Sequence, residues 1–186
     1  MDKSYWSTFY SNASLPECSN FCEFVIQHFC EHANIKHVLD AGCGNGRDSL
    51  VLSQHYKVTA VDNCGIQIET DKYIFLNKDF VTIDKSNYDL IYSRFTFHSI
   101  TNDNHSIFLS TILPNTYLAI ETRSTKGSEE IEFYGKTHFR NYTNINYLTT
   151  LLEKHCFEIL FLQEDKDFAV YKTENPVCIR VLCKKL

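Results

Sequence analysis

The feature that most constrains the fold is a glycine-rich segment, residues 38–48, with the sequence VLDAGCGNGRD. An apolar run ends there in Asp40, glycines follow at positions 42, 44 and 46, and residues 49–52 begin a predicted helix. This order indicates a strand, a tight turn and a helix. Glycine lets the backbone adopt conformations that other residues avoid and come close to a ligand, which the first N–H groups of the helix then face. We therefore expect the turn to bind a nucleotide-like ligand.

The spacing of the glycines narrows the choice of ligand. A dinucleotide-binding turn has the pattern G-x-G-x-x-G, which would need a glycine at position 47, where this chain has Arg47. The pattern here is D-x-G-x-G-x-G instead. A second predicted strand, residues 58–62, ends in Asp62, which lies 16 residues after Gly46. That interval leaves room for one helix and a return turn.

This combination resembles motif I and the following strand of the class I S-adenosylmethionine-dependent methyltransferases. The resemblance extends over residues 36–186 and implies an α/β fold: a Rossmann-like seven-stranded mostly parallel sheet with helices on both faces and a C-terminal antiparallel hairpin. It also implies S-adenosylmethionine as cofactor and S-adenosylhomocysteine as product, with Asp40 near the methionine end and Asp62 on the ribose hydroxyls. The implied cofactor-binding residues are Asp40, Gly42, Cys43, Gly44, Asn45, Gly46, Asp62, Asn63, Asp79, Phe80 and Ser93. The alternative is a Rossmann-like domain that keeps the turn but has lost the ligand.

Length and composition indicate a single domain. The chain has 186 residues, of which 44% are hydrophobic and 14% aromatic, which is enough for a sizeable core. We expect one methyltransferase domain over residues 1–186, with an N-terminal lid and helix (1–35), a cofactor-binding half (36–124), and a substrate loop with closing strands (125–186). A net charge of −5 without Lys/Arg runs argues against a nucleic-acid partner.

The same inspection bears on location and on metals. No apolar run approaches a bilayer span and no signal-peptide core follows Met1, so we expect a cytoplasmic protein without a membrane partner. The eight cysteines have mostly apolar neighbours, and we interpret them as reduced thiols. Cys18, Cys22, His28, Cys30 and His32 contain no C-x-x-C pair, so we expect no metal site. The sequence leaves the oligomeric state undetermined.

Hydrophobic periodicity predicts the remaining elements. Ser19 is a candidate N-cap for the first helix. The predicted helices are 20–33, 65–72, 106–113 and 144–155, and the predicted strands are 73–76, 88–93, 116–124, 157–162 and 177–183. Residues 1–17 contain an aromatic cluster that includes Tyr5, Trp6 and Tyr10. Two interpretations stay open for it: a lid over the cleft, or a brace packed on the domain surface.

The segment after the fourth predicted strand excludes one group of relatives. Enzymes that methylate exocyclic amines typically carry an acidic or amide residue followed by Pro-Pro and an aromatic there, whereas this chain has no proline between Pro16 and Pro114. Methylation of nucleobase amines is therefore not expected. The chain has Arg94 and His98 in that segment instead.

Polar residues near the ends of the fourth and fifth predicted strands indicate the substrate class. Because guanidinium groups match phosphate and carboxylate oxygens, we expect an anionic small-molecule substrate. The alternative is that one or two arginines pair with acids to hold the loop. His98 and His138 are the candidate bases, since a histidine that titrates near neutral pH can remove a hydroxyl proton without a metal. The predicted substrate contacts are Arg94, His98, Glu121, Arg123, His138, Arg140, Tyr5, Trp6 and Tyr10.

A looser resemblance concerns the reaction. An arginine and a histidine after strand four, with Glu-x-Arg at strand five, is similar to small methyltransferases associated with surface-polysaccharide biosynthesis. It implies O-methylation of a sugar, a sugar nucleotide or a phosphate-containing glycan precursor. The alternatives are a detoxifying small-molecule methyltransferase of the thiopurine or tellurite type, and a non-catalytic cofactor-binding regulatory domain.

Overall fold

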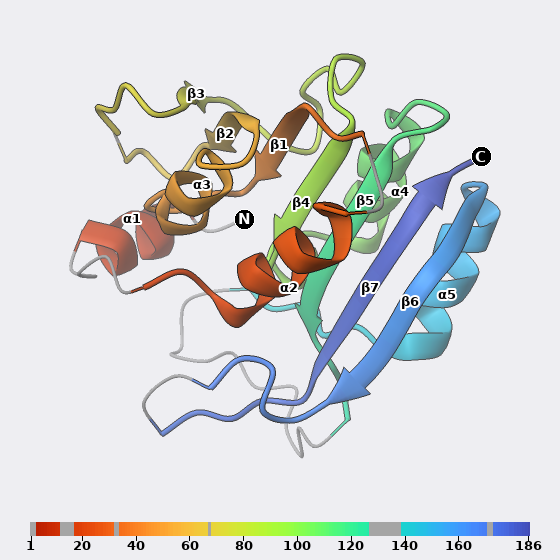
Figure 1. Ribbon diagram of the computed structural model, residues 1–186. Helices are drawn as coiled ribbons and strands as arrows, with labels where there is room; N and C mark the ends of the chain where they lie inside the picture. The colour runs from red at the N-terminus through yellow and green to blue at the C-terminus, as the bar shows by residue number, and fades with distance from the viewer. Residues whose placement is uncertain (1–2, 12–16, 32–33, 67, 127–138, 171–172) are drawn as a thin grey trace.

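The computed structural model describes residues 3–11, 17–31, 34–66, 68–126, 139–170 and 173–186. These residues form a seven-stranded sheet with the order β3-β2-β1-β4-β5-β7-β6 (Figure 1). Strands β1 to β4 pair in parallel with their neighbours, as does β5 with β4, while β7 is antiparallel to both β5 and β6. The fold predicted from the sequence is confirmed. The strands are β1 (His37–Ala41), β2 (Lys57–Asp62), β3 (Ile74–Asn77), β4 (Leu90–Arg94), β5 (Tyr117–Arg123), β6 (Phe157–Asp165) and β7 (Cys178–Lys185).

Helices cover both faces of the sheet, α2 and α3 on one and α4 and α5 on the other (Figure 1). The hydroxyl of Ser19 accepts a hydrogen bond from the N–H of Cys22, which confirms its prediction as an N-cap. The helical elements are α1 (Lys3–Ser11), α2 (Asn20–Phe29), α3 (Arg47–Leu52), the 3-10 turn η1 (Phe97–Ser99), α4 (Asn102–Ser110) and α5 (Ile145–Lys154).

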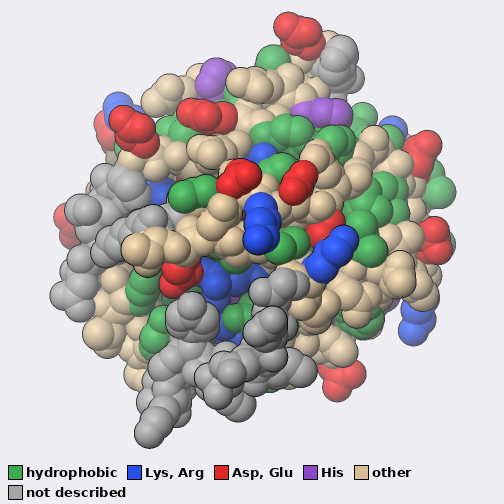
Figure 2. Space-filling view, turned by 90° about the horizontal axis from the view of Figure 1, so that it is seen from below, with side chains coloured by type: hydrophobic (Ala, Val, Ile, Leu, Met, Phe, Trp, Pro, Cys, Tyr) green, Lys and Arg blue, Asp and Glu red, His purple; other side chains and the backbone are tan. Residues whose placement is uncertain are grey.

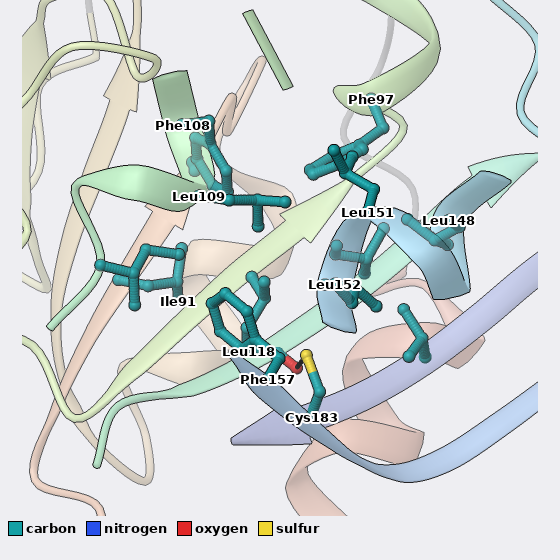
Figure 3. Close-up of a cluster of buried hydrophobic side chains, with 14 of the residues drawn as sticks. Ile91, Phe97, Phe108, Leu109, Leu118, Leu148, Leu151, Leu152, Phe157 and Cys183 are labelled. Atoms are coloured by element: carbon teal, nitrogen blue, oxygen red, sulfur yellow. Dashed lines mark hydrogen bonds between the residues drawn. The ribbon is translucent and has the colours of Figure 1, made fainter. Parts of the chain in front are cut away.

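Each face of the sheet buries its own apolar cluster. On the face of α4 and α5, Phe108 and Leu109 pack with Leu148 and Leu152 over the sheet residue Ile91 (Figure 3). On the other face, α2 contributes Phe21, Cys22, Val25 and Phe29. Strands buried from both sides explain the continuous apolar runs of β1 and β4 in the sequence. The sheet is therefore fixed between two helical layers.

Three predicted helices differ from the structure. Helix α2 ends at Phe29, and residues 30 and 31 of the predicted 20–33 form a turn. The described part of 65–72 contains no helix, and Gly65 adopts a positive φ of 87°, which helix geometry does not allow. Helix α4 begins four residues before the predicted 106–113, because Thr101 caps it by accepting from the N–H of Asn104. The sequence pattern missed this start because the first turn of α4 is polar.

The carboxyl end of the parallel strands is the edge where functional groups gather. Helix α1 and the connection between β6 and β7 both lie along this edge (Figure 1). The predicted substrate loop falls largely on residues 127–138, including His138, which lie outside the described residues. All eight cysteines are free thiols. Across the described ranges, no helix is long and apolar enough to cross a membrane.

Candidate active site

The glycine-rich turn has the geometry that its sequence predicts. Gly42, Gly44 and Gly46 have φ values of 81°, 55° and 78°, a region that side chains rarely adopt. A Cβ atom at Gly42 would lie 2.2 Å from Cγ2 of Thr96, and one at Gly44 would lie 2.4 Å from Cζ of Tyr10. Both conformation and space therefore require glycine at these positions.

Asp62 supports this turn from the end of β2. One of its carboxylate oxygens accepts from the N–H of Gly44 at 2.9 Å, and the other accepts from the N–H of Cys64 at 2.8 Å. A carboxylate oxygen has two acceptor sites, so each keeps one for a ligand. The residue thus holds the loop and presents acceptors to the space above it.

Asp40 lies at the end of β1 and is 2% exposed. One carboxylate oxygen accepts from the hydroxyl of Ser49 at 2.6 Å. Burial raises the pKa of Asp40 to about 8, with Asp48 and Asp62 adding repulsion and the Ser49 hydrogen bond opposing it. A cationic ligand beside this group would favour its ionised form.

A cavity of about 600 Å³ opens at this edge and joins the glycine-rich turn to the ends of β4 and β5. Figure 2, which views the edge from below, shows basic side chains in a hollow among hydrophobic ones. Six of the predicted cofactor residues line it: Asp40, Gly42, Cys43, Asn45, Asp62 and Phe80. This is the size of a small-molecule site.

Five predicted cofactor residues do not line the cavity. Gly44 and Gly46 are buried beneath Tyr10 and the Tyr73 hydroxyl, respectively. Asn63 is half-buried, and its Oδ1 finds no hydrogen-bond donor among the described residues. The other two are Asp79 and Ser93.

Asp79 and Ser93 lie outside the cavity lining. Asp79 is exposed and one of its carboxylate oxygens accepts from the N–H of Val81 at 2.8 Å, so its contact with the cofactor stays a prediction. Ser93 is fully buried, and its hydroxyl bonds to that of Thr96. Thr96, which the sequence analysis did not single out, lines the cavity in its place.

The cavity fits S-adenosylmethionine. Gly42, where an added Cβ atom would collide with Thr96, lies in its lining, and Asp62 has carboxylate oxygens that would accept from ribose hydroxyls. Asp40 and Asp48 add two carboxyl groups to the same wall, which suits a ligand with a sulfonium and an ammonium group. Phe80, which is 1% exposed, supplies an apolar surface beside Gly42.

On the acceptor side, two arginines share one buried acid. The Nε of Arg94 donates to Glu121 at 2.9 Å, and the Nε of Arg180 donates to the other oxygen of Glu121 at 2.7 Å. Arg94 lines the cavity, as predicted, but Glu121 is completely buried and does not. The predicted substrate contact of Glu121 is therefore corrected: it positions two arginines, because an unpaired carboxylate at that depth would be unfavourable.

A second ion pair lies near this cluster, beside the same Phe95 ring. Nη2 of Arg123 lies 2.6 Å from Oε2 of Glu174, a residue in the connection between β6 and β7. This matches the alternative in which an arginine holds a loop. Arg123 and Arg140 both line the cavity, as does the segment 168–170 of the same connection.

His98 is the described histidine of the cavity wall. It lies in η1, is 1% exposed, and its ring centroid is 5.2 Å from that of Phe95. Behind it, the buried His105 bonds through Nε2 to the carbonyl of Phe97 at 2.7 Å and through Nδ1 to the Tyr147 hydroxyl at 3.0 Å. Burial lowers the pKa of His105, so this ring is a neutral support for η1.

The N-terminal aromatics are on the cavity. Tyr5, Trp6 and Tyr10 line it from α1, together with Phe9. Tyr10 lies directly on Gly44, and burial, followed by the charge of Asp62, raises the pKa of its hydroxyl. The helix thus has the position of a lid, although whether it moves stays a prediction.

Sequence reasoning missed several residues of this site. Asp48 accepts from the hydroxyls of Ser19 at 2.7 Å and Tyr92 at 2.8 Å, which ties α2 and β4 to α3. An acid in the first turn of a helix that follows the glycine-rich turn was the available signal. For Arg180 the signal was a charge within the apolar run 177–183, and for Phe168 it was a connection longer than a tight hairpin needs.

Comparisons with known proteins identify the family of the chain. A family model described as a methyltransferase domain matches residues 20–160. A search of curated protein sequences gives no match.

Solved structures share the fold at low identity. A SAM-dependent methyltransferase from Anabaena variabilis is 16% identical with a TM-score of 0.74, over 99% of this chain and 93% of that one. TehB from Haemophilus influenzae is 18% identical with a TM-score of 0.68, over 99% and 67%. Burkholderia thailandensis 1,6-didemethyltoxoflavin-N1-methyltransferase, solved with 1,6-didemethyltoxoflavin and S-adenosylhomocysteine, is 18% identical with a TM-score of 0.68, over 89% and 76%.

The family match covers most of the chain, and the strand order, glycine-rich turn and strand-end acid agree with it. The chain therefore belongs to the methyltransferase domain family and is a class I enzyme that uses S-adenosylmethionine as methyl donor.

Proposed function

We propose that this enzyme methylates a small acceptor that carries an anionic group. The observation that carries the proposal is the cluster of Arg94, Arg180 and Glu121, in which two guanidinium groups share one carboxylate. The cluster has an excess of one positive charge, and Arg94 presents it to the cavity. A phosphate or carboxylate would balance this charge through the guanidinium N–H groups that Glu121 does not use.

The ion pair of Arg123 refines the proposal. Arg123 is neutralised by Glu174, so we assign it to the wall and not to direct binding of the acceptor's charge. Its Nη2–Oε2 distance of 2.6 Å indicates a strong charge-assisted contact. The predicted anionic substrate is therefore kept, with Arg94 as the residue that reads the charge.

His98 is the proposed base. Bound S-adenosylmethionine supplies an electrophilic methyl group, and the acceptor needs to lose a proton as it attacks. His98 lies in the cavity wall on the turn that follows Arg94, so an acceptor held by Arg94 would have its hydroxyl near the imidazole. A histidine in that position removes the proton near neutral pH.

The acceptor predicted from the sequence, a sugar or sugar nucleotide, remains our specific proposal within this class. The phosphate of such an acceptor would bind Arg94, and its sugar ring would lie against aromatic side chains that line the cavity. The thiopurine or tellurite type is the second candidate, because TehB shares the fold over 99% of this chain. A soft nucleophile of that type needs little base catalysis, which makes His98 the discriminating residue.

The test is an acceptor panel read by formation of S-adenosylhomocysteine. It pairs anionic and neutral compounds of similar shape: glucose 6-phosphate with glucose, and 4-hydroxybenzoate with 4-hydroxybenzyl alcohol, together with tellurite and 6-mercaptopurine. We expect the anionic member of a pair to have the higher kcat/KM, and Arg94→Lys to reduce that preference because lysine lacks the planar fork. Equal turnover of both members, or turnover of tellurite alone, would contradict the proposal.

A further inference from the structure

Phe95 has a backbone conformation that a bulky residue normally avoids. Its φ is 60°, in the left-handed region. The described part of the chain has three other non-glycine residues with positive φ, namely Asn115, Cys156 and Asp167. Asn115 is in the turn before β5, Cys156 follows α5, and Asp167 is in the connection after β6, so each has a local reason in a turn. Among these four residues, Phe95 alone lines the cavity.

Two hydrogen bonds hold this conformation. The N–H of Phe95 donates to the carbonyl of Glu121 at 2.7 Å, and its own carbonyl accepts from the hydroxyl of Ser99 at 3.1 Å. The residue is thus fixed to β5 on one side and to η1 on the other. Strained residues that the surrounding structure fixes in this way occur most often at functional sites.

The strain places the ring among the polar groups of the acceptor side. The guanidinium carbon of Arg94 lies 4.3 Å from the ring centroid and that of Arg123 lies 5.8 Å from it, while the His98 ring is 5.2 Å away. Phe95 is half-buried, so part of its ring stays open to the cavity. An apolar surface and a guanidinium therefore lie side by side, within reach of the proposed base.

We propose that Phe95 is a specificity-determining residue, on which the ring of the acceptor packs while the acceptor's anionic group binds Arg94. This deepens the proposed function and rests on it for the anionic group. An aromatic ring suits the flat face of a cyclic acceptor, and the neighbouring guanidinium strengthens that surface by cation–π contact. An acyclic acceptor of equal charge would lack this contact. The backbone strain is the cost of holding the ring in place.

The experiment separates strain from binding with three substitutions. Phe95→Gly and Phe95→Ala both remove the ring, but only glycine relieves the positive φ, so we expect Phe95→Gly to melt about 2–4 °C above Phe95→Ala. Asn115→Gly is the matched control, because it relieves a positive φ at a residue that does not line the cavity. We expect its turnover to equal that of the wild type. Phe95→Leu keeps apolar volume without the aromatic face.

For Phe95→Leu we expect KM for the cyclic acceptor turned over best in the panel to rise about tenfold, with kcat and the affinity for S-adenosylhomocysteine unchanged. Equal melting temperatures of the glycine and alanine variants, or an unchanged KM in Phe95→Leu, would overturn the role of Phe95. If the enzyme methylates neutral cyclic acceptors as well as anionic ones, the proposal of an anionic substrate is wrong. The KM of Phe95→Leu for those neutral acceptors then still tests whether the Phe95 ring binds the acceptor.

Discussion

Replacing Asp62 by alanine tests the cofactor site most directly. Its two oxygens accept from the N–H groups of Gly44 and Cys64, and each keeps one acceptor site for a ribose hydroxyl. A hydrogen bond to a charged group contributes about 1.5–3 kcal/mol, so losing two costs about 3–6 kcal/mol of binding free energy. At about 1.4 kcal/mol for each factor of ten, the dissociation constant of S-adenosylhomocysteine should rise about 10²- to 10⁴-fold.

The assay is isothermal titration calorimetry with S-adenosylhomocysteine, accompanied by thermal melting to show that Asp62→Ala remains folded. Asp71→Ala is the matched control, because Asp71 is an exposed aspartate that does not line the cavity. Its dissociation constant should equal that of the wild type. If folded Asp62→Ala binds within threefold of the wild type, or if Asp71→Ala loses affinity to the same extent, our assignment of the ribose contact is wrong.

Three further predictions concern base, lid and stability. His98→Ala should lower kcat about 10²- to 10⁴-fold, with partial recovery at high pH, and unchanged kcat would refute its role as base. Trp6 fluorescence should change when S-adenosylhomocysteine binds if α1 is a lid, and a constant spectrum would favour the brace. Burial lowers the pKa of Lys85 to about 8. Between pH 8 and its ordinary value of about 10.4, the unfolded chain binds more protons. The unfolding free energy of the wild type should therefore rise by about 2 kcal/mol relative to Lys85→Met from pH 7 to 9.5 in denaturant titrations, and parallel curves would contradict this.

Local patterns were sufficient to predict the cofactor side of the fold. The turn at 42–46 requires glycine through its own backbone, and Asp62 is placed by the length of the preceding strand. Both are short-range properties, so one sequence reveals them. The segment 65–72 misled the pattern because its apolar and polar residues suit either a helix or an irregular turn, and tertiary packing decides between them.

The acceptor side depends on contacts between distant segments. Nothing near Glu121 in the sequence indicates that it will pair with Arg180, 59 residues later, and leave the cavity wall. The partnership of Arg123 with Glu174 spans 51 residues. The positive φ of Phe95 is set by Glu121 and Ser99, so residue type alone gives no sign of it. Residue types near strand ends therefore predicted which arginines reach the site. They did not predict which of these arginines form ion pairs with acidic side chains of the protein.

The position of β7 has a consequence for how the enzyme becomes active. This strand inserts between β5 and β6 although it follows both in the chain, and it brings Arg180 to Glu121. Until β7 pairs, Glu121 holds only Arg94, and the carbonyl of Phe168 lacks the Arg180 guanidinium that bonds it at 3.0 Å. The acceptor wall therefore depends on the pairing of β7 with β5, whereas β7 supplies no residue of the glycine-rich turn. A substitution that weakens this pairing should lower methyl transfer more than it lowers the affinity for S-adenosylhomocysteine.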